Sequence, residues 1–360
     1  MMSEKVGYEN MKNEKTVGVK EIARRANVSI ATVDRVIHNR TGVSPKTRSK
    51  IEEIIKELNY QPNILASRLA SGKVFDIAVL IPMGSEETDF WDAPLRGIKR
   101  AEAEIRQYGI RIQTFLFDLN DRNSFTEQGR LIHERSFDGI LLSPSFVNEA
   151  IEFVKICKTR NIPYVFVDTN IKEHSSLSYI GPHLFQSGYL GAKLCTLGAS
   201  NSNKVMMVNI SKEINNYNYL QIEEGFKGYC KDHNKPMEIV RLDIQQSDYL
   251  SVAKELAKSF RSHPDLSVVF VTKSRVFLVA RYLEEYNIKN VHLVGYDFLK
   301  ENVEYIRKGI IDFLICHKPE EQGYKGIMSL YHHLTLSLPV DKIYFMPIDI
   351  ITKENHEFYR

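Results

Sequence analysis

Apolar residues in the first sixty positions recur with the spacing of short amphipathic helices. The pattern predicts three helices, over residues 19–26, 29–38 and 44–58. The second and third would begin at Ser29 and Ser44, whose hydroxyls can accept a backbone N–H at a helix N-terminus. Two helices joined by a short turn and braced by a third form the helix-turn-helix arrangement, so we expect one here.

The second predicted helix has an outer face of unusual composition. Val33 and Val36 would point inward, while Ile30, Ala31 and Arg35 would share the opposite, solvent-facing side. Small and apolar groups beside a basic one indicate a surface that meets a partner.

From Phe75 onward the pattern changes to short β-rich runs that alternate with amphipathic helices. Nine strands are predicted, over residues 76–82, 110–118, 138–143, 162–168, 204–210, 238–243, 266–272, 291–297 and 312–317. One further strand, the last, is expected within residues 344–355. Such alternation is typical of doubly wound parallel sheets, and this number of strands exceeds one comfortable sheet. The predicted fold is a small all-α helix-turn-helix head followed by an α/β two-lobed core.

Ligands of doubly wound sheets bind beyond the carboxyl ends of the strands. The polar residues at or just after these ends are Ser85, Asp118, Ser143, Asp168, Asn170, Thr272, Asp297 and His317. We therefore expect a ligand site among them.

Residues 63–73, NILASRLASGK, predict one further helix of about two turns between head and core. A helix this short is not stable in water on its own. We expect a hinge that forms only against a partner surface.

Charge is unevenly divided between the two parts. Residues 1–73 contain 14 Lys and Arg against 8 Asp and Glu, a net charge of +6, whereas the remaining residues have a net charge of −3. A basic head on a mildly acidic body suggests that the head meets a polyanion, with a solvated basic surface as the alternative.

Other features weigh against several classes of protein. Residues 1–15 are polar and unlike a signal peptide, and no apolar run is long enough to cross a bilayer, so we expect a disordered leader and a cytoplasmic protein. The four cysteines stand alone, without metal-type spacing. No phosphate-binding loop, nucleophile elbow or zinc-protease motif is present, so we predict no enzyme, no catalytic residue, no cofactor and no metal site.

Residues 19–73, VKEIARRANVSIATVDRVIHNRTGVSPKTRSKIEEIIKELNYQPNILASRLASGK, resemble the head of LacI-family bacterial transcription regulators. The stretches VGYD, GFKGY and KPEEQGYKG follow in the order of the family's core, a two-lobed periplasmic-binding-protein type I domain. The resemblance implies a leader (1–15), a helix-turn-helix DNA-binding domain (16–62), a hinge (63–73) and an effector-binding and dimerisation core (74–360).

By this resemblance the second helix would enter the DNA major groove, where a reading helix must lack bulk and offer donors. Ile30 and Ala31 would meet thymine methyl groups, and Arg35 would bind guanine. In the hinge, Leu69 would wedge between central base pairs in the minor groove, with Ala66 nearby. The side chains of a type that binds phosphate are Ser29, Thr32, Asn39 and Thr47.

In the core the resemblance implies a small effector, usually a sugar, bound between the lobes. Phe90 and Trp91 would stack on this ligand, and Asp168, Asn170 and Asp297 would bind its hydroxyl groups. The other implied effector-binding residues are Asp118, Ser143, Lys273, Arg275 and His317.

Some positions depart from the family pattern. Many sugar-binding relatives have Arg where this chain has Ile222, and many relatives have Ser where it has Asp34, which would repel phosphate unless a base pairs with it. Basic groups stand at His183, Lys273, Arg275 and His317. If several of them line the cleft, the ligand would be an acidic sugar derivative rather than a neutral sugar or polyol.

The resemblance implies a repressor of carbohydrate-metabolism genes that binds a palindromic double-stranded DNA operator as a homodimer. A sugar or sugar derivative would control its operator affinity, and no membrane partner is expected. The alternative is a solute-binding protein of a sugar uptake system, which would need a secretory signal and would have no use for the basic head.

Replacing the implied wedge gives the first prediction. We expect Leu69→Ala to weaken binding to a specific operator far more than binding to random duplex, because only the specific complex gains from the kinked DNA. A gel-shift titration on both duplexes measures this, and equal losses on the two DNAs would contradict it.

Overall fold

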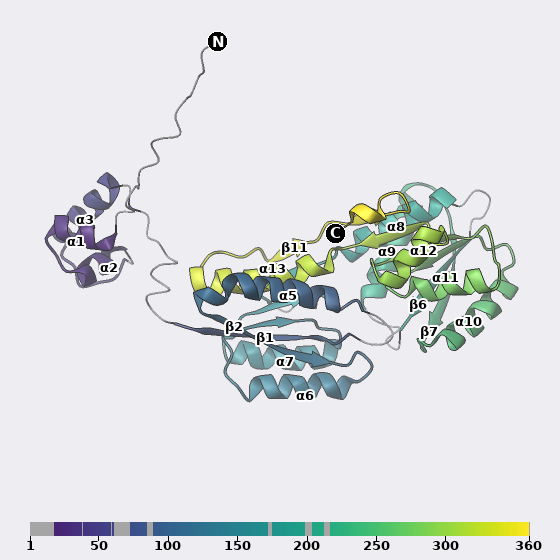
Figure 1. Ribbon diagram of the computed structural model, residues 1–360, viewed down its shortest axis with the longest axis horizontal. Helices are drawn as coiled ribbons and strands as arrows, with labels where there is room; N and C mark the ends of the chain where they lie inside the picture. Colours follow the sequence, from purple (N-terminus) through teal and green to yellow (C-terminus); the bar gives the residue numbers. More distant parts are fainter. Residues whose placement is uncertain are drawn as a thin grey trace, which may run out of the picture. The chain divides into compact units, whose positions relative to one another are not determined.

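The computed structural model describes residues 18–359, apart from residues 38, 59, 61–72, 85–88, 172–174, 199–203 and 212–216. The chain divides into two compact units, residues 1–72 and 73–360, and each is described by itself (Figure 1). The leader and most of the hinge, including Ala66 and Leu69, lie outside the described residues. Among the described residues, no helix has the length and apolar character that crossing a bilayer requires.

The first unit contains three helices, α1 (Val19–Ala26), α2 (Ile30–Ile37) and α3 (Pro45–Glu57). Each helix contributes one fully buried side chain to a shared apolar core, namely Ile22, Val33 and Ile51. The three predicted helices are therefore confirmed, with boundaries shifted by no more than one residue where the structure describes them.

Both serine caps predicted for the head are present. The Oγ atom of Ser29 accepts a hydrogen bond from the Thr32 backbone N–H at 3.1 Å, and Ser44 accepts one from Thr47 at 3.2 Å. Between α1 and α2, Asn27 adopts the left-handed conformation, with φ of 52°. A short polar side chain tolerates this conformation, which ends α1 and allows a tight turn.

The second unit contains two sheets, each with six strands in the described part. The first has the order β11-β5-β4-β3-β1-β2 and the second β12-β10-β9-β8-β6-β7. The first is built from β1 (Phe75–Pro82), β2 (Ile110–Phe117), β3 (Gly139–Leu142), β4 (Tyr164–Val167), β5 (Ser178–Gly181) and β11 (Ile343–Phe345). The second is built from β6 (Lys204–Ile210), β7 (Glu238–Ile244), β8 (Val268–Val271), β9 (His292–Tyr296), β10 (Phe313–Cys316) and β12 (Asp349–Ile351).

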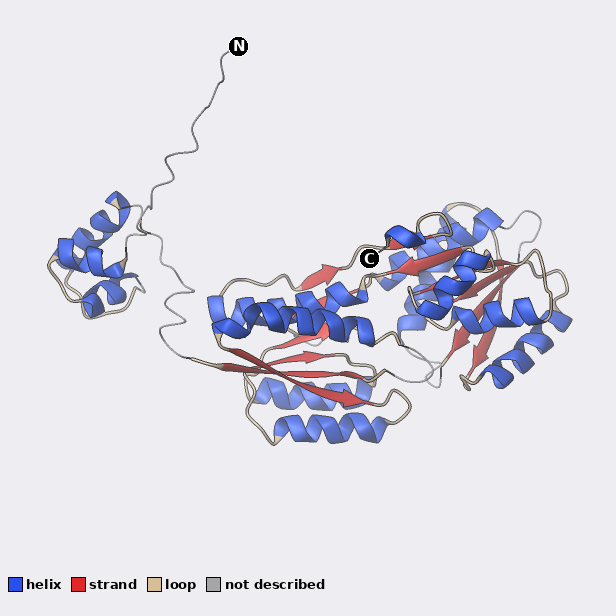
Figure 2. Cartoon of the chain, viewed as in Figure 1, coloured by secondary structure: helices blue, strands red, loops and turns tan. Residues whose placement is uncertain are grey.

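Helices cover both faces of each sheet (Figure 2). On the first sheet, one face packs against α5 (Asp92–Ile105) and α13 (Pro319–Tyr331), and the other against α6 (Arg122–His133) and α7 (Val147–Thr159) (Figure 1). On the second, one face packs against α8 (Leu184–Gly198) and α9 (Tyr217–Asp232), and the other against α10 (Tyr249–Ser262), α11 (Val276–Glu285) and α12 (Lys300–Lys308). Short helical segments are η1 (Arg106–Tyr108), η2 (His332–Leu336) and η3 (His356–Phe358).

Two strand predictions need correction. The single last strand expected within 344–355 is two strands, β11 in the first sheet and β12 in the second, and Pro347 lies between them. Proline cannot donate to a ladder, so it separates the two pairings. The sheets are also not wholly parallel, because β12 runs antiparallel to β10. Strand β5 was not predicted at all.

The chain passes between the two sheets at three points. These lie between β5 and α8 (residues 182–183), between β10 and α13 (residues 317–318) and between β11 and β12 (residues 346–348). The first two follow the carboxyl ends of parallel strands, so the loops that carry polar side chains converge on the same region.

The helix pair α8 and α9 approaches closely enough to require glycine. A Cβ atom added to Gly225 would lie 1.9 Å from the Phe185 carbonyl oxygen, and one added to Gly188 would lie 2.0 Å from the Ile222 carbonyl oxygen. In both cases the obstacle is backbone, which cannot rotate away. The position of α9, and with it of Ile222, therefore depends on these two glycines.

We expect Gly225→Ala to lower the free energy of unfolding by about 1–3 kcal/mol, because the methyl group forces the two helices apart. The matched control is Gly228→Ala on the same helix, where the nearest atom is in the Phe185 ring at 3.1 Å and can move. Guanidinium denaturation followed by circular dichroism should separate the two variants. Equal stability of both would contradict the close-packing argument.

Candidate functional site

The outer face of α2 is uncovered in the head. Ile30 has 50% of its surface exposed, and Ala31 and Arg35 are also exposed, whereas Val33 and Val36 are buried. The structure thus presents the three predicted base-reading side chains together on one side of a short helix. An exposed isoleucine next to an exposed guanidinium can offer both apolar contact and bidentate donors to base edges.

The side chains predicted to bind phosphate lie at the N-termini of α2 and α3 and in the loop after α2. Ser29 and Thr32 pair through their hydroxyl oxygens at 2.9 Å at the start of α2, and Ser44 and Thr47 do so at 2.8 Å at the start of α3. Each pair therefore stands at a helix N-terminus, where backbone N–H groups favour an anion.

Asn39 is tied to an arginine that sequence reasoning did not single out. The Arg48 guanidinium donates to Asn39 Oδ1 at 2.9 Å and to the Arg40 carbonyl oxygen at 2.8 Å. Asn39 also adopts the left-handed conformation, with φ of 50°. Arg48 therefore fixes the loop after α2. Because it lies nine residues after Asn39, no local sequence pattern indicated this contact.

The acid on α2 has a basic partner. Asp34 Oδ2 lies 3.3 Å from the Arg40 guanidinium. This ion pair offsets the repulsion that a lone carboxylate would exert on a phosphate. It is the kind of pairing with a base that we expected at Asp34.

A cavity in the second unit is lined from both lobes. Its lining includes seven of the ten predicted effector-binding residues, namely Phe90, Trp91, Asp168, Lys273, Arg275, Asp297 and His317. The polar residues that the sequence reading did not propose as effector ligands are Asn120, Ser145, Thr169, Ser211, Asn218, Thr272, Ser274, Tyr296 and Gln322. Thr272 alone among these was noted at a strand end.

The other three predicted residues lie outside the cavity lining. Asp118 Oδ1 accepts the Asn120 N–H at 2.8 Å and so closes a turn, while Asn120 itself lines the cavity. Ser143 is fully buried and pairs with Ser145 at 3.1 Å. Asn170 is half-buried, and the neighbouring Thr169 lines the cavity in its place.

Two aromatic rings form one corner of the cavity. Phe90 and Trp91 meet edge to face, with centroids 5.3 Å apart and an interplanar angle of 86°. Trp91 is only 4% exposed and also belongs to the apolar core of the first lobe. The packing holds the corner rigid, which reduces the entropy lost when a ligand stacks there.

Two carboxyl groups face the cavity from equivalent places in the two lobes. Asp168 follows β4 and Asp297 follows β9, each the third strand in its sheet order. Both have the left-handed backbone, with φ of 66° and 71°. Their N–H groups donate to the neighbouring strand, to Ile180 at 3.1 Å and to Ile315 at 3.0 Å.

The pKa values of both carboxyl groups are raised. Burial raises the pKa of Asp168 to about 6. Burial, and then the nearby Asp168 carboxylate, raises the pKa of Asp297 to about 8. Lys273 acts in the opposite direction on both, without cancelling the effect. Such displaced values are typical of functional sites.

His317 provides a neutral ring rather than a charge. Burial lowers its pKa to about 4. Its Nε2 atom pairs with the Ser187 hydroxyl at 2.9 Å, and its ring stacks on Tyr296 with centroids 5.8 Å apart. His183 is not part of the lining; its Nδ1 accepts the Gln186 N–H at 3.2 Å. Two of the four basic groups that favoured an acidic ligand therefore bring no positive charge to the cavity.

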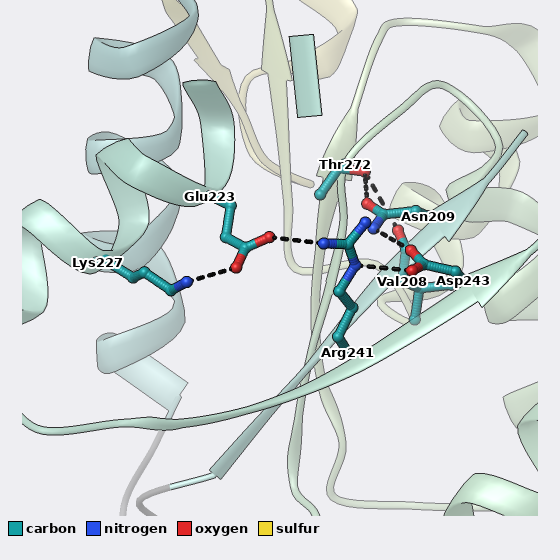
Figure 3. A network of polar contacts seen from close by, with 7 residues as sticks. All are labelled: Val208, Asn209, Glu223, Lys227, Arg241, Asp243 and Thr272. Carbon is teal, nitrogen blue, oxygen red and sulfur yellow. Dashed lines mark hydrogen bonds and ion pairs between the residues drawn. The ribbon is translucent and has the colours of Figure 1, made fainter. Parts of the chain in front are cut away.

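Contacts across the lobes and behind the cavity wall brace the site. Asn218 on α9 donates to the Thr169 hydroxyl of the first lobe at 3.0 Å. Behind Thr272, the buried Asn209 accepts the Thr272 hydroxyl and donates to Asp243 at 2.6 Å (Figure 3). This part of the network ties the end of β8 to β6 and β7.

The network continues to α9. Arg241 donates to Asp243 at 2.7 Å and reaches Glu223 at 3.4 Å, and Glu223 also accepts from Lys227 at 2.6 Å (Figure 3). Glu223 follows Ile222, which lines the cavity. Two walls of the cavity are thus joined through one chain of polar contacts.

Comparisons with known proteins agree with this architecture. A model of the bacterial regulatory proteins of the lacI family matches residues 18–63, and a model of the periplasmic binding protein domain matches residues 77–336, more than half of the chain. The chain belongs to the periplasmic binding protein domain family and carries a lacI-family head. The LacI-family resemblance read from the sequence is confirmed.

Relatives of this lacI-type chain are named as regulators. Catabolite control protein A of Staphylococcus xylosus is 30% identical over 183 residues, 48% of this chain and 53% of that protein. The transcriptional regulator RegA of Clostridium acetobutylicum is 32% identical over 156 residues, 43% and 44% of the two chains. The chain thus matches about half the length of these relatives.

Solved structures show the same fold. A LacI transcriptional regulator of Bacteroides fragilis has a TM-score of 0.75 and 29% identity, over 80% of this chain and 100% of that chain. A glucose-galactose binding protein of Geobacillus stearothermophilus has a TM-score of 0.68 and 19% identity, over 79% and 99% of the two chains.

The lacI-type head gives the next prediction. We expect Arg35→Ala to weaken binding to a specific duplex by about 1–3 kcal/mol and to relax preference at one base pair, because a bidentate contact to guanine is lost. The control is Arg24→Ala on α1, where Arg24 pairs with Glu21 at 2.7 Å; this variant should keep the base preference. Selection from randomised duplexes measures both, and an unchanged preference in the Arg35 variant would contradict the assignment.

Proposed function

We propose that this chain is a sequence-specific transcription regulator of carbohydrate-metabolism genes, acting in the cytoplasm as a repressor. The observation that carries the proposal is the union, in one chain, of a lacI-type head with an uncovered α2 face and a two-lobed core with a cavity lined from both lobes. Relatives named catabolite control protein A and MalR support the assignment to carbohydrate metabolism.

The core supports control by a small ligand. Aromatic rings, carboxyl groups and amides from two lobes converge on one cavity, a combination that suits the apolar faces and hydroxyl groups of a sugar. A ligand that contacts both lobes stabilises the arrangement in which those contacts are made. If that arrangement has a different affinity for DNA, the two binding events are coupled by the same free energy in both directions.

The proposal includes a homodimer on a palindromic operator. Each head presents one short helix, which reads only a few base pairs, and two heads related by a two-fold axis read an inverted repeat. The dimer is supported by the family pattern of the head.

The rival hypothesis is a solute-binding protein. The core has the fold of sugar-binding proteins of that class at 16–23% sequence identity, and identity this low supports a shared fold only. The lacI-type head favours the regulator, because a solute receptor needs no DNA-reading helix. The named relatives are regulators, which supports a protein without catalytic activity.

The deciding experiment is selection and sequencing of genomic fragments bound by the full chain. We expect an inverted repeat near carbohydrate genes, and a shift in its affinity when the matching sugar is added. A variant that begins at Lys73, where the second unit starts, should keep the ligand and lose the DNA. No preference for any inverted repeat over random duplex, with and without sugars, would overturn the proposal.

A further inference from the structure

The uncovered face of α2 also carries an acidic side chain. Successive residues of a helix lie about 100° apart around its axis, so Asp34 falls between Ile30 and Ala31 on this face. The Asp34 side chain is 46% exposed. An acid therefore occupies the middle of the surface on which the predicted base-reading side chains lie.

The middle of such a face and its margins meet different parts of a duplex. A helix in the major groove turns the middle of one face toward the base edges, and its ends and flanking loops meet the phosphates. Ser29 and Thr32 pair at the start of α2, and Arg40 lies in the loop beyond its end. Asp34 lies between these two regions, so its carboxylate is directed at bases rather than at the backbone.

Arg40 holds the Asp34 carboxylate and offsets its charge. Asp34 Oδ2 accepts a hydrogen bond from the Arg40 guanidinium at 3.3 Å. The loop that carries Arg40 is fixed as well, because its backbone N–H donates to the Arg35 carbonyl oxygen at 2.7 Å and its carbonyl oxygen accepts from Arg48 at 2.8 Å. The neutral pair can approach a polyanion at a smaller electrostatic cost than a lone carboxylate could.

A carboxylate discriminates among the four bases because it can only accept hydrogen bonds. In the major groove cytosine offers the N4 amino group as a donor, whereas guanine offers the acceptors O6 and N7 and thymine the acceptor O4. Adenine offers a donor at N6 beside an acceptor at N7. A carboxylate at the base edges therefore favours cytosine and is repelled by guanine and thymine.

We propose that Asp34 binds a cytosine in each operator half-site, in the base pair next to the one that Arg35 reads. The proposal rests on the proposed function and adds a residue that determines operator specificity. Consecutive residues of a helix point about 100° apart, so the side chains of Asp34 and Arg35 diverge and meet neighbouring base pairs. The expected signature is a guanine with a cytosine beside it, on either strand.

The alternative role for Asp34 is to orient Arg40 toward a phosphate. The two roles differ in what a substitution of Asp34 changes. Loss of an oriented phosphate contact weakens binding to every duplex alike and makes Kd less dependent on salt. Loss of a base contact changes the order of affinity among the four bases at one position and leaves the salt dependence as it was.

The test is selection of randomised duplexes by the full chain, followed by competitive titration of four duplexes that differ only at the assigned position. We expect the unaltered chain to bind the cytosine duplex about tenfold more tightly than the guanine or thymine duplex. Asp34→Asn should shift the preference to adenine, because an amide both accepts and donates. Asp34→Ser should remove most of the preference, because a hydroxyl group can pair with either kind of edge. Both variants should keep the salt dependence of Kd.

The matched control is Glu21→Gln on α1, whose carboxylate also pairs with an arginine, Arg24, at 2.7 Å; this variant should keep the cytosine preference. A selected repeat without cytosine next to the guanine would overturn the proposal. So would a base preference that both Asp34 variants leave unchanged, or an equal loss of affinity on all four duplexes. These results leave the selection of an inverted repeat intact, whereas a full chain that selects no repeat overturns both proposals.

Discussion

The constraint on which the second unit depends is that, among the residues the structure describes, the chain passes between its two sheets at three places. Two of them follow the carboxyl ends of parallel strands, β5 and β10, where the loops of a doubly wound sheet carry their polar side chains. The cavity therefore forms between the lobes, and its walls belong to two bodies joined by short segments. A ligand that touches both walls can change their spacing, whereas a ligand bound to one lobe alone could not.

The cavity tolerates groups that an ordinary core would exclude. Two carboxyl groups with raised pKa values, a lysine over a tyrosine ring and a neutral buried histidine all lie within its walls. Burying such groups destabilises a folded protein unless they are paired. The polar chain behind Thr272 and the close glycine contacts between α8 and α9 hold the walls in place despite this cost.

Much of the fold follows from the sequence pattern, and the misses have physical causes. Val33, Ile51 and the serine caps mark the head because helical spacing and capping are local properties. β5 (Ser178–Gly181) has only two apolar residues, between a serine and a glycine, whereas the predicted four-residue strands are almost wholly apolar. β11 and β12 have three residues each, and their pairing is decided by the rest of the sheet. The pattern could not show that a proline splits the last segment between two lobes.

The candidate site shows the same division between local and tertiary information. Asp118 and Asp168 both follow a strand, but the Asp118 carboxylate closes a turn by accepting the Asn120 N–H, so only Asp168 lines the cavity. Asn218 and Gln322 lie on helices, where only the packing of α9 and α13 turns a side chain toward a ligand. A strand-end acid is thus a useful first signal, and the turn that follows the strand decides whether its side chain reaches the cavity. Asp168 and Asp297 follow strands at the same place in the two sheet orders, and both line the cavity.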